Sequence, residues 1–298
     1  MPLKMSDYEI DPMGERLVIG LYGKPGCGKS SAILDLVRAK QYVTIISLDE
    51  GLIQLHRNWP KYRKYFDVIY PKRMGADDRP ETFDLLQSIF ASIRMAESRA
   101  VNLVNRGCPA KRIWTFLDTA THLQGLLLQE GKRFEEQVIS GNTKGRRTDV
   151  PFLAKIDFNQ NAGIMTEISN MILRIPGNIV MSFQQGEDKS YVNTMYYIPK
   201  LQGASYQMWV GDLDVLLYLR VNGDKSRTFC TKPATTYYAK DRLDVLPDEI
   251  LLVIGDEFGS QPTLQYIRDL YYPPAVKAAP AVVTVTPDGQ TELPTQGE

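Results

Sequence analysis

The segment GKPGCGKSS, residues 23–31, restricts the fold of this chain more than any other stretch of its sequence. An apolar, strand-like run precedes it at 16–22, and a helical run follows it at 30–39. The segment itself satisfies the pattern G-x-x-x-x-G-K-[ST] at Gly23, Gly28, Lys29 and Ser30. In this setting, the N–H groups of a loop and of a helix N-terminus converge on one point and bind phosphate oxygens there. The sequence therefore predicts a phosphate-binding loop between a buried strand and a helix.

ATP and Mg²⁺ are the ligands that this loop predicts. We expect Lys29 to reach the β- and γ-phosphates and Ser30 to ligate Mg²⁺. A glycine-rich turn that binds nothing is the alternative, and the flanking strand and helix argue against it. The predicted nucleotide contacts come from the whole loop: Gly23, Lys24, Pro25, Gly26, Cys27, Gly28, Lys29, Ser30 and Ser31.

Short apolar runs alternate with helical segments along most of the chain. Helical periodicity is clearest at 81–106 and 160–175. The apolar runs are typical of strands buried on both faces, and they occupy 16–22, 42–48, 67–70, 112–118, 178–183 and 214–220. The alternation predicts an α/β fold with a mostly parallel sheet flanked by helices. Later strands at 225–240 and 250–254 are expected to form an antiparallel extension towards the C-terminus.

Composition divides the chain into an N-terminal arm (1–15), one nucleotide-binding domain (16–270) and a proline-rich tail (271–298) that we expect to be disordered. The 35 basic and 35 acidic side chains cancel, so net charge neither favours nor excludes nucleic acid as a partner. Three scattered cysteines and two histidines do not form a disulfide framework or a Cys-x-x-Cys metal site. No apolar run approaches the roughly 18 residues of a membrane span. We expect a cytoplasmic protein.

Two further acidic positions complete the expected chemistry. Asp118 ends the run RIWTFLD and is the predicted second ligand of Mg²⁺. The alternative is that Asp118 only caps the helix that follows. Glu50, which ends YVTIISLDE, is the predicted base that activates water, with Asp49 as its rival. A solvated acid in the first turn of a helix is the plain alternative for Glu50.

The order of these motifs resembles the core of RecA-type ATPases, in which a glutamate closes the strand after the loop and a segment like FLDT follows. NIVMSFQQG is similar to the RecA strand that ends in a glutamine sensing the γ-phosphate, which implies this role for Gln184, with Gln185 as an alternative. The resemblance covers 16 to about 250. It is strongest to a group of short, phage-encoded RecA-like ATPases associated with single-strand annealing and recombination. It implies ATP hydrolysis that DNA stimulates, in the host cytoplasm.

The segment YYAKDR resembles an element of RecA-fold hexameric helicases whose cations enter the ATP site of the neighbouring subunit. Lys240 and Arg242 would project from one face of a strand, because strand side chains alternate. The resemblance implies a homo-oligomer in which Lys240 and Arg242 act in trans on the triphosphate. A hairpin with solvated charges is the alternative.

Single-stranded DNA is the partner that the resemblance implies, through two loops. The first, 140–149, carries Lys144, Arg146 and Arg147. The second, 186–199, carries Lys189 and Tyr191, whose ring could stack on a base. A third basic and aromatic cluster, WPKYRKYF at 59–66, either binds nucleic acid or lays its cations over packed rings. For each of these segments a solvated surface remains the alternative.

Two other functions stay open at this point. In a small-molecule kinase, Arg146 and Arg147 would close over a transferred phosphate. In a nucleotide-gated adaptor or helicase loader, ATP would be bound with slow turnover. Single-strand-binding or replication proteins are further partners that such roles would involve. The RecA-like order of motifs favours an ATPase that depends on DNA, although fold alone does not determine function.

Overall fold

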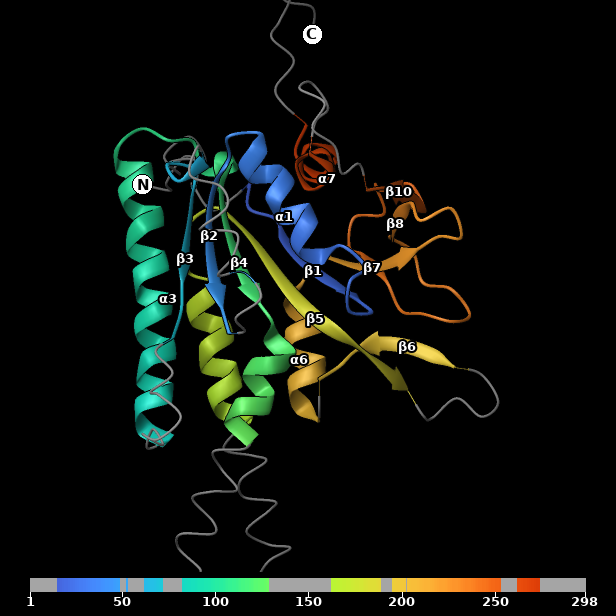
Figure 1. Ribbon diagram of the computed structural model, residues 1–298, viewed down its shortest axis with the longest axis horizontal. Coiled ribbons are helices and arrows are strands. Elements are labelled where there is room, and N and C mark those ends of the chain that lie inside the picture. Colours follow the sequence, from blue (N-terminus) through green and yellow to red (C-terminus); the bar gives the residue numbers. More distant parts are fainter. Residues whose placement is uncertain are drawn as a thin grey trace, which may run out of the picture.

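A computed structural model describes residues 15–48, 52, 62–71, 82–128, 162–188, 195–201, 203–252 and 262–273. Its centre is a ten-stranded sheet (Figure 1). The strands are β1 (Val18–Gly23), β2 (Tyr42–Ser47), β3 (Phe66–Ile69), β4 (Ile113–Asp118), β5 (Asn178–Asp188), β6 (Tyr196–Pro199), β7 (Val215–Val221), β8 (Arg227–Cys230), β9 (Lys240–Asp241) and β10 (Glu249–Leu251).

The main path of the sheet runs in the order β10-β8-β7-β1-β5-β4-β2-β3. All pairs from β7 through to β3 are parallel. β8, β9 and β10 add antiparallel pairs beside β7, and β6 folds back on the extended end of β5. The predicted fold class, a mostly parallel α/β sheet with a C-terminal antiparallel extension, is confirmed.

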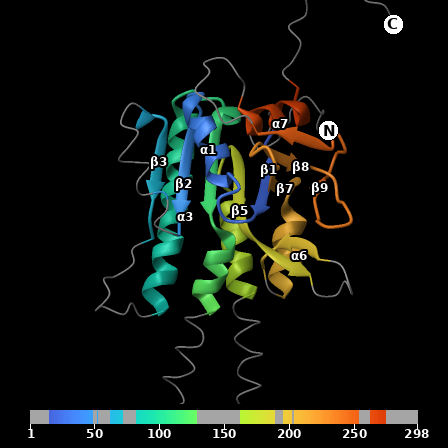
Figure 2. The ribbon, with the colours of Figure 1, turned by 45° about the vertical axis from the view of Figure 1, so that its right-hand side comes forward.

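Helices cover both faces of the sheet, as Figure 2 shows from a second side. α1 (Lys29–Arg38) and α7 (Thr263–Tyr271) pack on one face, where they share a hydrophobic cluster with β1 residues such as Ile19. The opposite face carries α3 (Thr82–Asn105), α6 (Ala204–Asp212) and two helices described over 120–128 and 162–172. A short 3₁₀ turn, η4 (Ala110–Arg112), precedes β4. Among the helices in the described ranges, none combines the length and the apolar character needed to cross a membrane.

The central strands are buried on both faces, which explains their unbroken apolar sequence. In β1, Ile19 and Leu21 point into the α1 and α7 layer, while Val18 and Tyr22 point into the α3 and α6 layer. Alternation along the strand therefore supplies side chains to both cores from a single apolar run.

The structure differs from the sequence prediction mainly near the C-terminus and at β5. β5 continues to Asp188, beyond the apolar run that ends at 183, because its polar end pairs with β6. α7 was not predicted, although Leu264, Ile267 and Tyr271 form a buried stripe at helical spacing. Apart from Glu15, the predicted arm lies outside the described residues, as does most of the predicted tail.

Asp35 is a buried acid in α1 whose two oxygens differ in their surroundings. Arg38 Nη1 lies 3.1 Å from Oδ1, while Oδ2 has no hydrogen-bond partner among the described residues. Burial raises the pKa of Asp35 to about 6, although Arg38 opposes the rise. Between about pH 4 and pH 6, the folded state therefore holds a proton on Asp35 that the unfolded chain, with a pKa of about 3.9, has already released.

Because of this raised pKa, charged Asp35 destabilises the fold above about pH 6, and protonation relieves the penalty as the pH falls. We expect Asp35→Asn to raise the free energy of unfolding by about 1–3 kcal/mol at pH 8 and by much less at pH 4. Urea denaturation at both pH values measures the difference, with exposed Asp248→Asn as the control. An equal effect of Asp35→Asn at both pH values would contradict this origin.

Candidate nucleotide site

The phosphate-binding loop connects the carboxyl end of β1 to the first residue of α1. Gly28 caps this helix with φ 110°, and Gly26 has φ 77°, so both occupy the left-handed region that favours glycine. Space is also limiting at Gly28, because an added Cβ would lie 2.7 Å from Arg227 Cδ and 3.3 Å from Leu252 Cδ2. The glycine before Lys29 is thus required by its backbone and by its neighbours.

The loop forms one wall of a pocket of about 430 Å³. The ends of β4 and β5 form the opposite wall, so residues far apart in the sequence meet here. The lining consists of Pro25, Gly26, Gly28, Lys29, Ser30, Ser31, Leu34, Leu52, Asp118, Thr119 and Gln184. Six of the predicted loop residues therefore share one pocket with Asp118 and Gln184, while sequence reasoning missed Leu34 and Leu52.

Strand order explains why Asp118 and Gln184 reach this pocket. The carboxyl ends of parallel strands lie at one edge of a sheet, and β5 lies between β1 and β4. Gln184 is paired with Gly23 across β1 and β5, at the start of the loop. Asp118 ends β4, the next strand along.

Asp118 is 5% exposed and is held by the strand beside it. Ser182 Oγ donates a 2.7 Å hydrogen bond to Asp118 Oδ1. The following helix is capped by Thr119, whose Oγ1 accepts a 3.0 Å hydrogen bond from the N–H of His122. Ser182 was not predicted, and its only signal in the sequence is a hydroxyl within the apolar run NIVMSF.

Lys29 lies against its own loop. Its Nζ donates hydrogen bonds to Gly23 O at 2.9 Å and Lys24 O at 3.2 Å, and lies 3.6 Å from Cys27 Sγ. Cys27 is 2% exposed, so its thiol fills space beneath the loop. The ammonium group is thus kept at the pocket by two loop carbonyls.

The two neighbouring glutamines of β5 point in different directions. Gln184 lines the pocket, and its N–H donates to Thr121 Oγ1 at 3.0 Å. The Gln185 Oε1 instead accepts a 3.5 Å hydrogen bond from the hydroxyl of Tyr218. Because strand side chains alternate, Gln184 is the one of the two glutamines whose side chain lies on the pocket side of β5.

The residues of this pocket fit a nucleotide with Mg²⁺. The N-terminus of α1 and the Lys29 ammonium provide donors and positive charge for phosphate oxygens. Ser30 and Asp118 provide the oxygen ligands that Mg²⁺ prefers. Within the described ranges no group of three His, Cys, Asp or Glu side chains forms a metal site of its own.

Comparison with protein families identifies this arrangement. A family model described as AAA domain matches residues 15–243. The chain belongs to the AAA domain family. Its pocket and sheet are those of a P-loop ATPase of the AAA type. The match includes the phosphate-binding loop, Asp118 and Gln184.

Solved structures with a similar fold are distant from this AAA-domain protein in sequence. The KaiC-like protein PH0186 of the hyperthermophilic archaeon Pyrococcus horikoshii OT3 is 10% identical, with a TM-score of 0.39, over 74% of this chain and 80% of that chain. The RadB recombinase is 10% identical, with a TM-score of 0.37, over 72% and 79%. An ATPase of the type III secretion system of pathogenic bacteria is 11% identical, with a TM-score of 0.41, over 68% and 52%. Among curated protein sequences no match is found.

Several predicted residues of this AAA-domain protein lie outside the described ranges. They are the predicted base Glu50 and its rival Asp49, together with the predicted DNA contacts Lys144, Arg146, Arg147, Lys189 and Tyr191. Their roles stay predictions.

Lys240 and Arg242 lie away from the pocket, at the amino ends of the parallel strands. β9 pairs with Val215 and Leu216 at the amino end of β7, whereas the phosphate-binding loop follows the carboxyl end of β1. The two side chains do share one face, as the sequence predicted. They point towards the last turn of α6 in their own chain.

Backbone carbonyls at the C-terminus of α6 are the hydrogen-bond acceptors of both cations within the protomer. Lys240 Nζ donates to the carbonyls of Val210 and Gly211, each at 3.0 Å. Arg242 Nη2 donates to the carbonyls of Gly211 and Leu213 at 2.9 and 3.1 Å. These carbonyls carry the negative end of the helix dipole, so two cations close together are stabilised here. Burial, with Arg242 nearby, lowers the pKa of Lys240.

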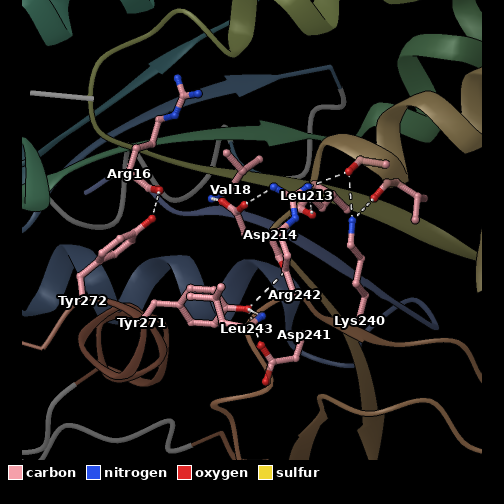
Figure 3. Close-up of polar contacts among 12 residues, drawn as sticks. Arg16, Val18, Leu213, Asp214, Lys240, Asp241, Arg242, Leu243, Tyr271 and Tyr272 are labelled. Carbon is pink, nitrogen blue, oxygen red and sulfur yellow. Dashed lines mark hydrogen bonds and ion pairs between the residues drawn. The ribbon is translucent and has the colours of Figure 1, made fainter. Parts of the chain in front are cut away.

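Asp214 connects this cap to the central strands. Its Oδ1 lies 2.9 Å from Arg242 Nη1, and its Oδ2 accepts a 2.9 Å hydrogen bond from the N–H of Val18 (Figure 3). Arg242 therefore joins α6, β7 and β1. The role of Lys240 and Arg242 at the nucleotide site of a neighbouring subunit stays a prediction.

We expect Arg242→Ala to lower the free energy of unfolding by about 1–2 kcal/mol, because it removes the side-chain donor of the Leu213 carbonyl and the ion pair with Asp214 Oδ1. The half-exposed position of Arg242 keeps the effect modest. Urea denaturation measures the change. Arg174→Ala, which removes an exposed guanidinium, is the control and should cost less. Unchanged stability of Arg242→Ala would contradict the capping role.

Proposed function

We propose that this protein binds ATP with Mg²⁺, hydrolyses the nucleotide, and uses hydrolysis to act on single-stranded DNA. The observation that carries the first part is the shared pocket of Lys29, Ser30, Asp118 and Gln184. A phosphate-binding loop alone is a motif, whereas a buried carboxylate and an amide brought to it from two other strands form a site for phosphoryl chemistry.

Each side chain has a defined task in this proposal. The N–H groups at the start of α1 bind the phosphates, and Lys29 places positive charge beside them. Ser30 and Asp118 hold Mg²⁺, and Ser182 keeps the Asp118 carboxylate in one orientation. When bound, the ion neutralises charge on the phosphate oxygens. Gln184 presents an amide to the outermost phosphate.

The proton of the attacking water requires a base, for which we retain Glu50, with Asp49 as the alternative. A carboxylate accepts this proton, whereas Thr119, which follows Asp118, has no basic group. An amide at the base position would preserve shape and remove proton uptake. Substitution of either acid by its amide therefore identifies which one is the base.

The DNA part of the proposal is supported by the RecA-like order of motifs and by the basic segment that carries Lys144, Arg146 and Arg147. It places the protein in phage recombination, annealing or replication. A nucleotide-gated loader would show slow hydrolysis that DNA does not change. A small-molecule kinase would transfer phosphate to an acceptor other than water. Phosphate release with and without single-stranded DNA separates these outcomes.

An oligomer is the remaining part of the proposal. In it, Lys240 and Arg242 contribute positive charge to the nucleotide site of a neighbouring copy. Arg242 is the better placed of the two, because its side chain is 48% exposed while it holds α6.

Lys29→Ala and Asp118→Asn should each lower Mg²⁺-dependent phosphate release by at least about 100-fold, because they remove the phosphate cation and the charge that holds the metal. Ser182→Ala should retain part of the activity, since it only frees the orientation of Asp118. Thermal unfolding checks that each variant is folded, and exposed Lys225→Ala is the control. Normal turnover in Lys29→Ala or Asp118→Asn would refute the assignment.

Mixing two inactive variants tests the trans arrangement. Arg242→Ala retains an intact phosphate-binding loop, and Lys29→Ala retains an intact cation pair. If the pair acts across subunits, mixed assemblies regain phosphate release, which varies with the mixing ratio and is greatest near equal amounts of the two variants. A mixture that co-assembles, as shown by sedimentation, and stays inactive would leave Lys240 and Arg242 with their role at α6 alone.

A further inference from the structure

A second concave site lies far from the nucleotide pocket, at the β3 edge of the sheet. Its volume is about 980 Å³, and it lies between the C-terminal half of α3, the start of β3 and the segment that leads into β4. Five cations line it, namely Lys64, Arg94, Arg99, Arg106 and Arg112. We call this site the basic groove. Figure 1 shows that β3 and α3 lie at the opposite side of the sheet from β10.

The charge of the basic groove is strongly one-sided. Asp67 is the acidic residue in its lining, and it forms an ion pair with Arg99. The other four cations form no ion pair with an acidic side chain of the described residues. Cations gathered in one concavity repel each other unless an anion lies between them, so the groove has a field that attracts polyanions.

Arg94 and Arg106 have their charged groups available. Both are exposed, and within the described ranges neither side chain makes a hydrogen bond or an ion pair. Arg112 is fixed instead, since its Nη2 donates to Lys40 O at 2.9 Å and its guanidinium lies 5.6 Å from the centre of the Tyr42 ring. Lys64 Nζ similarly lies 4.9 Å from the centre of the Tyr65 ring. The lining thus combines held cations with available guanidinium groups in α3 and directly after it.

The spacing along α3 shows which kind of anion fits. Arg94 lies in α3 and Arg106 directly follows its last residue, so twelve residues separate them, which corresponds to about 18 Å along the helix axis. Ser98 and Asn102 lie between them at intervals of four residues and add hydrogen-bond donors to the same lining. A single phosphate ion would engage only a part of this row. A chain of phosphates, spaced a few ångströms apart, matches its length.

We propose that the basic groove binds the phosphate backbone of single-stranded nucleic acid, independently of base sequence. Guanidinium groups match phosphate oxygens in a bidentate manner, and backbone contacts of this kind fix position without reading bases. The contact includes Lys64, which belongs to the basic and aromatic segment 59–66 noted in the sequence. This inference rests on the DNA part of the proposed function and moves its main contact to the β3 edge.

The location of the groove separates DNA binding from nucleotide binding. Tyr42 and Arg112 stand at the amino ends of β2 and β4, whereas the nucleotide pocket is at the carboxyl ends. Binding to the groove therefore does not require a filled nucleotide pocket. An experiment without nucleotide tests the groove alone.

The test measures binding of a fluorescently labelled oligothymidylate by anisotropy, without nucleotide, over a range of NaCl concentrations. The double variant Arg94→Gln and Arg106→Gln should bind at least about tenfold more weakly, and the slope of log K against log salt should fall by about 1.4 for two lost phosphate contacts. The matched control, Arg174→Gln with Lys225→Gln, removes two exposed cations outside the groove and should bind like the unmodified protein.

The possible outcomes separate the two proposals. If the double variant binds the oligothymidylate as tightly as the unmodified protein and with the same salt slope, the proposal for the groove is overturned. DNA then binds elsewhere on the protein. Equal weakening in the control variant also overturns it. A protein that binds no oligothymidylate overturns the DNA part of the proposed function as well, while ATP hydrolysis remains separately testable. A change in sedimentation of the double variant without DNA, and no change in DNA binding, identifies the groove as a contact between copies and refutes the proposal.

Discussion

The parallel alignment of β1, β5 and β4 is the constraint on which the candidate site depends. It brings the ends of three strands to one edge, so that a loop, an amide and a carboxylate from distant segments line a common pocket. The hydrogen bond from Ser182 to Asp118 works only because β5 lies directly beside β4. A different strand order with the same sequence motifs would leave Asp118 without this support.

Opposite ends of helices lie at the two ends of the parallel strands. At the carboxyl edge, the N-terminus of α1 supplies positive potential that suits phosphate groups. At the amino edge, the C-terminus of α6 supplies negative potential, which Lys240 and Arg242 neutralise. Cationic side chains therefore have different partners at the two ends. Lys29 lies at a pocket suited to phosphate, whereas Lys240 and Arg242 bind helix carbonyls.

Local sequence patterns predicted the fold and the centre of the site. Contacts that depend on pairing between distant strands could not be predicted from them. The loop at 23–31 and the ends of the runs at 118 and 184 could be found because each lies at a boundary between an apolar strand and a polar segment. The partner of Lys240 and Arg242 could not be found in this way, since α6 precedes them by about thirty residues and meets them only through strand pairing. The basic groove combines residues from 64, from α3 and from 112, whose proximity depends on the order of β2, β3 and β4. In contrast, the stripe of Leu264, Ile267 and Tyr271 was visible in the sequence and marks α7.

The close packing at Gly28 extends the functional unit beyond the part of the chain that the AAA domain model matches. That match ends at 243, whereas Leu252 packs against Gly28 from beyond β10, next to Arg227 from β8. The antiparallel extension is thus the outer support of the phosphate-binding loop. A fragment cut at the family boundary would keep every motif residue and yet lose part of the wall that limits the motion of the loop. Its weaker affinity for nucleotide would then reflect the entropy of ordering the loop, with the chemistry of the pocket unchanged.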